Sequence, residues 1–162
     1  MRWWLHAVPT DSLGHRAAHA DALLLAALSP YEVSLAFTTV DRSGEVSRLA
    51  LTALVTGPRE GLLLGGRVKE VEGPPAEGRC IRFPGQDELT GVHPAGAIVA
   101  SSAVDEVVGV GVPVSAGDLV DTQGFVRPTL VDGRLVLLVE RAAGGVLRPT
   151  ESRDPHECCG GH

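Results

Sequence analysis

One run of helix-forming residues near the start of the chain limits what the rest of the sequence can become. Residues 13–28 are rich in alanine and leucine, follow a possible N-cap at Asp11 or Ser12, and end at Ser29-Pro30. At 3.6 residues per turn the run places its larger apolar residues on one face: Leu13, Ala17, Ala20, Leu24 and Ala27. The pattern predicts one amphipathic helix, so most of the remaining chain has to form other elements.

Short β-type runs separated by turn residues make up most of that remainder. Residues 2–8 predict a first strand, and residues 33–40, 45–56 and 62–68 predict an antiparallel meander. Further short strands are expected at 80–83, 97–101 and 106–112. Asp132-Gly133 predicts a type I′ turn between strands 125–131 and 134–140, with Pro128 placing the first of these at an edge or a bulge.

These elements predict an α+β fold. We expect one N-terminal amphipathic helix packed on a mainly antiparallel sheet or on a small, partly closed β-barrel. A chain of 162 residues is long enough to bury one core. We therefore expect a single domain over residues 1–148, followed by a His/Cys-rich tail over residues 149–162.

Charge and hydropathy exclude two classes of partner. The formal net charge is −6 and no basic patch with interleaved aromatic residues occurs, which argues against nucleic acid. The longest apolar stretch, residues 22–28, is too short to cross a membrane, and the first residues lack the pattern of a signal peptide. We expect a soluble, cytoplasmic protein that binds a small-molecule substrate or other protein subunits and forms a homo-oligomer.

The end of the chain carries four soft donors within seven residues, at His156, Cys158, Cys159 and His162. Imidazole and thiolate are preferred ligands of zinc and related transition metals. The spacing differs from the Cys-x-x-Cys pairs of zinc fingers, and adjacent side chains in an extended chain point in opposite directions. A set with one cysteine, one or both tail histidines and a donor from elsewhere fits best, while a solvated tail or a redox pair of cysteines are alternatives.

His15 and His19 could supply the donor from elsewhere. Their i, i+4 spacing places both imidazoles on one helix face, where they could chelate one ion. Metalloproteases use this spacing with a glutamate between the histidines. Here Arg16, Ala17 and Ala18 intervene, which removes the protease interpretation. Two solvent-facing histidines are the alternative to ligation.

His93 is the candidate catalytic residue. It lies in an irregular polar segment near Asp87 and Glu88, and a histidine pKa near neutrality suits a general base. A solvated loop histidine is the plainer interpretation. No phosphate-binding glycine motif and no nucleophile elbow occurs in the sequence.

Three functions follow as hypotheses. The first is a metal-binding protein, and possible zinc-dependent enzyme, in which metal-bound water between the two chain ends performs hydrolysis or hydration. The second is a non-catalytic subunit or binding module of an oligomer. The third comes from residues 33–55, strand, Asp-x-x-Gly turn and strand, which resemble the opening hairpin of flavin-binding split barrels related to pyridoxamine phosphate oxidase. The chain departs from that family because it lacks the proline after the turn glycine and the basic phosphate-gripping helix.

We predict that the purified protein binds zinc or another transition metal through the tail. Truncation after Pro155 should abolish binding, because structural and catalytic zinc sites need three or four protein donors. Elemental analysis of wild type beside the truncated chain and a His15→Gln/His19→Gln variant measures this. A wild-type content below about a tenth of an equivalent contradicts the prediction.

Overall fold

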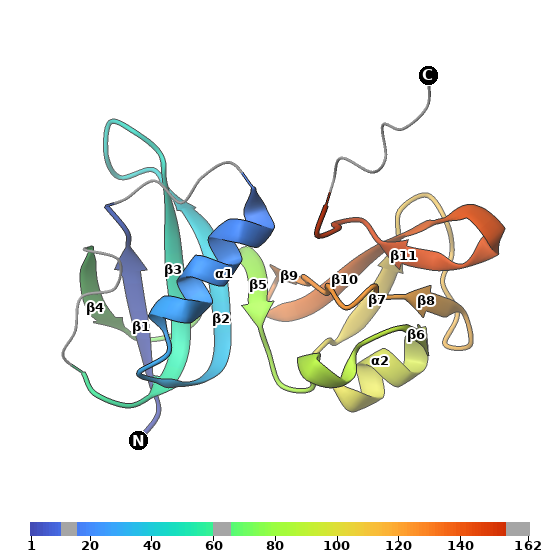
Figure 1. Ribbon diagram of the computed structural model, residues 1–162, viewed down its shortest axis with the longest axis horizontal. Helices are drawn as coiled ribbons and strands as arrows, with labels where there is room; N and C mark the ends of the chain where they lie inside the picture. Colours follow the sequence, from blue (N-terminus) through green and yellow to red (C-terminus); the bar gives the residue numbers. More distant parts are fainter. Residues whose placement is uncertain (11–15, 60–65, 155–162) are drawn as a thin grey trace. The chain divides into compact units, whose positions relative to one another are not determined.

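The computed structural model describes residues 1–10, 16–59 and 66–154. Backbone contacts group the chain into two compact units, Met1–Phe83 and Pro84–His162, each shown in Figure 1. We describe each unit separately. The boundary expected between residues 148 and 149 stays a prediction.

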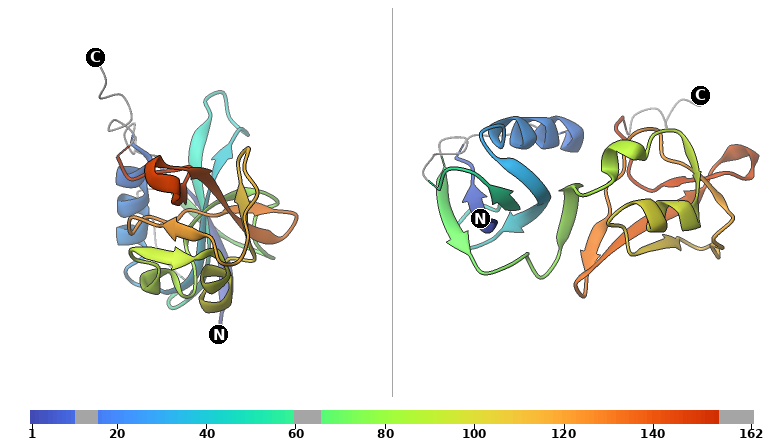
Figure 2. Two further views of the ribbon diagram at one scale, coloured as in Figure 1. Left: turned by 90° about the vertical axis from the view of Figure 1, so that its right-hand side faces the viewer. Right: turned by 90° about the horizontal axis from the view of Figure 1, so that it is seen from below.

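The first unit is a five-stranded antiparallel sheet with one helix. Its sheet order is β4-β1-β3-β2-β5, and every neighbouring pair is antiparallel. Figure 2 shows the twist of these strands. The elements are β1 (Trp3–Val8), α1 (Ala17–Ala27), β2 (Glu32–Asp41), β3 (Arg48–Thr56), β4 (Arg67–Val71) and β5 (Gly78–Arg82).

The second unit mixes parallel and antiparallel pairs. Its strands follow the order β9-β10-β11-β8-β6, with β7 parallel to β10 and β11 parallel to β8. The elements are the 3-10 helix η1 (Gln86–Glu88), β6 (Val92–Pro94), α2 (Ala95–Ser101), β7 (Glu106–Gly109), β8 (Leu119–Asp121), β9 (Thr129–Val131), β10 (Arg134–Arg141), the 3-10 helix η2 (Ala143–Gly145) and β11 (Leu147–Pro149).

The expected α+β fold with an amphipathic helix is wrong. The described residues form eleven strands and only two short α-helices, in open sheets. Helix α1 is not amphipathic, because small apolar residues lie all around it: Ala22 and Ala26 are exposed while Asp21 is buried. A helix with alanine on its exposed side has no distinct polar face.

Two local predictions also fail. Residues 97–101 were expected as a strand and belong to helix α2, where only Ile98 of that run is fully buried. The expected meander is interrupted, because β4 pairs with β1 and not with β3. A period of two identifies a strand but not its partner.

The Asp-Gly hairpin is confirmed. Asp132 and Gly133 have φ values of 50° and 76°, as a type I′ turn requires. Arg134 pairs with Val131 across the turn. The first arm is shorter than the expected residues 125–131, because β9 begins only after Pro128, whose missing backbone N–H cannot join the ladder.

The side chains of β1 alternate between the two faces of the first sheet. Trp3, Leu5 and Ala7 are buried, and they alternate with the half-buried Trp4, His6 and Val8. The buried set belongs to one apolar cluster with side chains of α1, β2, β3 and β5. Other members of this cluster are Ala20, Leu24, Leu28, Tyr31, Ala36, Leu51, Ala53, Val55 and Ile81.

One ion pair connects α1 to β5 within this unit. Arg79 Nη1 and Nη2 donate to Asp21 Oδ1 and Oδ2 at 2.7 and 2.8 Å. The Asp21 side chain is 2% exposed and the Arg79 side chain 23%. A two-point bond of this kind fixes orientation as well as distance, so it sets where the helix lies along the strand.

Among the described residues, the helices are too short or too polar to cross a lipid bilayer.

We predict that removing one partner of the Asp21–Arg79 pair destabilises the protein by about 3 kcal/mol, because the remaining charge stays buried without its counter-ion. Asp21→Leu and Arg79→Met should each lower the urea midpoint measured by tryptophan fluorescence. The double variant should lose less than the sum of the two single variants. Additive losses contradict a direct pair.

Candidate functional site

A row of five side chains crosses the first sheet on the face opposite the apolar cluster. Lys69 pairs with His6, His6 with Thr52, Thr52 with Phe37, and Phe37 with Cys80. Each residue comes from a different strand, so the sheet presents an ammonium, an imidazole, a hydroxyl, a phenyl ring and a thiol in sequence. We call this set the cross-strand row.

The apolar half of the row, Phe37 and Cys80, is buried. Phe37 is 2% exposed and Cys80 is fully buried, and Cys80 Sγ donates to Arg82 O at 3.2 Å. Trp4 stacks on Phe37 with 6.2 Å between ring centroids. These contacts leave the polar half of the row, on β4, β1 and β3, as the part that a ligand can reach.

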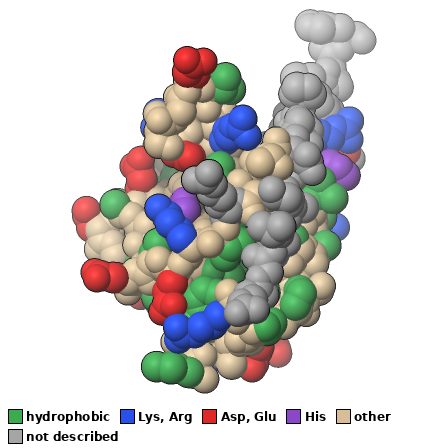
Figure 3. All heavy atoms as spheres, turned by 90° about the vertical axis from the view of Figure 1, so that its left-hand side faces the viewer, with side chains coloured by type: hydrophobic (Ala, Val, Ile, Leu, Met, Phe, Trp, Pro, Cys, Tyr) green, Lys and Arg blue, Asp and Glu red, His purple; other side chains and the backbone are tan. Residues whose placement is uncertain are grey.

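A shallow pocket of about 270 Å³ lies over that polar half. His6, Thr39, Thr52 and Lys69 supply its polar groups. Its apolar and backbone wall is formed by Val71, Gly73, Pro74 and Pro75. Figure 3 shows the unit from the side of its β4 edge, where a histidine and a basic side chain are neighbours at the surface.

Close backbone approach holds β4 in this position. A Cβ at Gly66 would overlap the carbonyl oxygen of Val8, so glycine is required where the chain enters β4. The approach brings β4 alongside β1 and thereby places Lys69 opposite His6.

The hydrogen bond between His6 and Thr52 fixes the state of the imidazole. His6 Nδ1 lies 2.8 Å from Thr52 Oγ1, and Thr52 is only 3% exposed. Within the described residues, the ring of His6 offers the only acceptor bonded to this hydroxyl. A buried hydroxyl proton without an acceptor costs about 1–3 kcal/mol. The arrangement therefore favours the Thr52 hydroxyl as donor, Nδ1 as acceptor and the proton on Nε2.

Burial and charge keep this imidazole neutral. Desolvation lowers the pKa of His6 below 6.5, and the Lys69 ammonium lowers it further, against a smaller opposing effect of Asp41. The pKa of Asp41 is itself lowered, chiefly because its carboxylate accepts hydrogen bonds from Ser43; Ser43 N donates to Asp41 Oδ1 at 3.0 Å.

A second, larger hollow of about 390 Å³ lies beside the first residues of β1. It is lined by Trp3, Arg59 and Glu70 among others. Arg59 donates to Glu70 at 2.8 Å and its guanidinium lies 5.6 Å from the ring centroid of Trp3. Both side chains of this ion pair are about half exposed, and each charge is paired with the other. This hollow therefore has less charge available to bind a ligand than the first pocket has.

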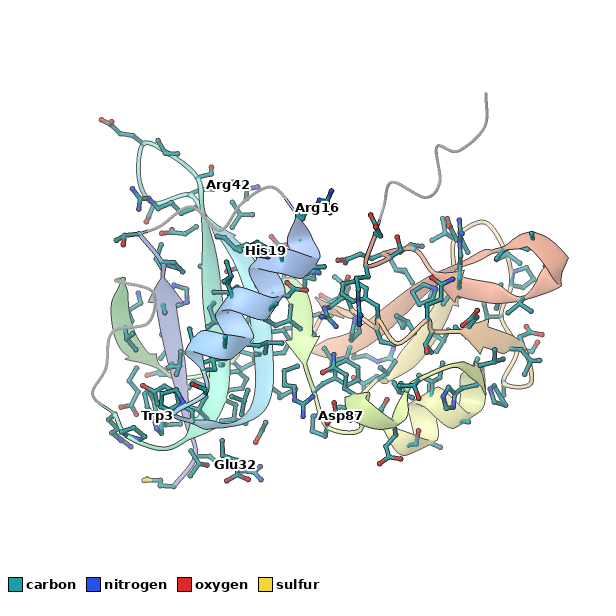
Figure 4. The ribbon with its side chains drawn as sticks, viewed as in Figure 1. Trp3, Arg16, His19, Glu32, Arg42 and Asp87 are labelled. Atoms are coloured by element: carbon teal, nitrogen blue, oxygen red, sulfur yellow. The ribbon has the colours of Figure 1, made fainter. Side chains whose placement is uncertain are left out.

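The residues expected to bind metal fall mostly outside the described part of the chain. His15, His156, Cys158, Cys159 and His162 all lie outside it. His19 is described: it is exposed on α1 (Figure 4). Within residues 1–10, 16–59 and 66–154, no three His, Cys, Asp or Glu side chains gather to hold an ion. Ligation by the tail therefore stays a prediction.

His93, the expected general base, lies on β6 in the second unit. Its Nε2 is 2.7 Å from the carbonyl oxygen of Thr90, so Nε2 donates and carries the proton. Nδ1 is then the nitrogen that could accept a proton. Catalysis by His93 stays a prediction.

Sequence reasoning missed His6, Thr52 and Lys69. Each is a single polar residue in an apolar strand, and their neighbourhood depends on which strands pair. The available signal was the alternation of residues 3–8, which places His6 on the face opposite Leu5.

Known proteins give no further guide to this site. The chain matches no family model, no curated protein and no solved structure.

We predict that His6 makes the folded state less stable as the pH falls from 7 to 5. The unfolded chain takes up the histidine proton near pH 6.5, whereas the folded chain takes it up only at lower pH, so acidification favours unfolding. The stabilisation is present above pH 6.5 and is lost below it. Protonation of Asp41 changes the stability only below its ordinary pKa of 3.8, which lies outside this range.

Urea unfolding of wild type and His6→Asn across pH 5–7 measures the effect, since asparagine keeps an acceptor for Thr52 but does not titrate. His19→Gln, altered at an exposed histidine, is the matched control and should follow wild type. Parallel pH profiles for wild type and His6→Asn contradict the assignment.

Proposed function

We propose that the protein is a non-catalytic binding module that takes a small organic molecule in the pocket over the cross-strand row. The observation that carries the proposal is the convergence of Lys69, His6 and Thr52, from three strands, on one hollow. Small-molecule sites combine apolar walls with a few placed polar groups. Val71, Pro74 and Pro75 supply the walls here.

The size of the pocket supports a small ligand. About 270 Å³ lies just below the usual range for ligand pockets, roughly 300–1,000 Å³. A compact metabolite suits this volume better than a flavin. Beside the pocket the row continues into Phe37 and Cys80, which are buried.

The character of the lining supports binding more than chemistry. The imidazole of His6 is engaged by Thr52 through Nδ1, and the remaining polar groups are an ammonium and hydroxyls. These groups orient a ligand by hydrogen bonds. A cytoplasmic location and association with further copies or other subunits belong to the same proposal, and the metal-binding role of the tail stays a separate prediction.

We predict that small organic fragments perturb the backbone amides of His6, Thr52, Lys69 and Gly73 in ¹H–¹⁵N NMR spectra of the full chain. Val71→Trp should abolish the perturbation, because the indole fills the pocket. Val40→Trp is the matched control, since Val40 is 51% exposed and does not line the pocket. Unchanged binding by Val71→Trp, with well-dispersed spectra, would place the ligand elsewhere.

A further inference from the structure

We infer that the ligand of this pocket carries a carboxylate, which the Lys69 ammonium and the Nε2–H of a neutral His6 bind together. The inference rests on the proposed binding function and names the chemical class of the ligand. It rests on the charges, the hydrogen-bond donors and the composition of the lining.

The lining carries one formal charge, and it is positive. Lys69 is exposed at the pocket and is the only lysine of the chain. The Asp41 carboxylate is close enough to act on His6 and Lys69, but it does not line the pocket and it accepts a hydrogen bond from Ser43 N. Glu70 is paired with Arg59, and because it follows Lys69 directly in β4 its side chain points to the other side of the sheet. The charge that a ligand meets in the lining itself is therefore the Lys69 ammonium.

His6 adds a second donor. Thr52 binds Nδ1, and because the buried hydroxyl proton needs an acceptor, the favoured tautomer of the ring carries its proton on Nε2. The two nitrogens point to different sides of the ring, and Nε2 therefore points away from Thr52. Among the described residues the ring of His6 is hydrogen-bonded to Thr52 alone. Nε2–H is left to donate to a ligand oxygen.

The two donors are neighbours. His6 and Lys69 are directly paired across β1 and β4, and paired side chains on one face of an antiparallel sheet lie about 5 Å apart at Cβ. A carboxylate presents two acceptor oxygens on one carbon and can accept from both donors at once. The Thr39 hydroxyl lines the same pocket and offers a third polar contact.

The same features favour a carboxylate over a phosphate. Phosphate sites use several backbone N–H groups at a helix N-terminus, or arginine in two-point contact. The described lining is built from strands and a proline-containing loop, with a single ammonium. One positive charge matches a monoanion. Val71, Pro74 and Pro75 then contact the hydrocarbon part of the ligand.

Three probes of nearly equal shape test the inference: benzoate, benzamide and benzamidinium, which are anionic, neutral and cationic. Titration of the full chain, followed by ¹H–¹⁵N NMR, should show benzoate binding over the cross-strand row about tenfold more tightly than benzamide, as one charge-assisted hydrogen bond provides. Benzamidinium should bind more weakly still. Equal or tighter binding of benzamide or benzamidinium overturns the carboxylate assignment.

Two variants locate the effect. Lys69→Met should weaken benzoate about tenfold and leave benzamide unchanged, because only the charge-assisted contact is lost. Thr52→Val should remove the donor to Nδ1, change the ¹⁵N shifts of the His6 ring and weaken benzoate. Arg16→Met, which alters an exposed cation on α1's N-terminal side, is the matched control and should behave as wild type. Unaltered benzoate binding by Lys69→Met contradicts the inference.

The two proposals fail in different ways. If the probes or other fragments bind over the cross-strand row without preference for negative charge, the carboxylate assignment is wrong and the binding module stands. If no fragment and none of the three probes perturbs His6, Thr52 or Lys69, both are wrong.

Discussion

The pairing of β1 between β3 and β4 is the constraint on which the first unit depends. It places Leu5 opposite Ala53 in the apolar cluster and His6 opposite both Thr52 and Lys69 on the other face. Because side chains alternate along a strand, a slip of one residue would expose Leu5 and bury His6 among apolar groups. The register that protects the core is therefore the register that assembles the cross-strand row.

Strand β5 shows the same division of the sheet into two faces with different tasks. Arg79 binds Asp21 of α1 on the face of the apolar cluster, while its neighbour Cys80 lies beside Phe37 at the buried end of the row. The ion pair fixes the helix on one face of the sheet, and the ring and thiol are buried on the other. Neighbouring residues of one strand thus pack against different parts of the unit.

Local patterns in the sequence predicted strands better than they predicted partners. Most of the strand expected over residues 45–56, which is β3, and the Asp132-Gly133 turn were located correctly, because strand-type composition and turn chemistry are encoded by neighbours in the chain. Helix α1 was misjudged because alanine counts as apolar whether it faces the core or water. The row could not be predicted, since the meeting of His6 with Lys69 depends on β1 entering between β3 and β4, a long-range choice that no local window contains.

The uniqueness of Lys69 has a practical consequence. Arginine supplies the other thirteen basic side chains, and guanidinium groups are inert toward mild acylating reagents, whereas primary amines react with them. Apart from the α-amino group, an amine-directed fluorophore or crosslinker can attach only at this position. The chain therefore carries one reactive side-chain amine, at the rim of the pocket, and the protection of this amine from reagent can be followed without any engineered residue.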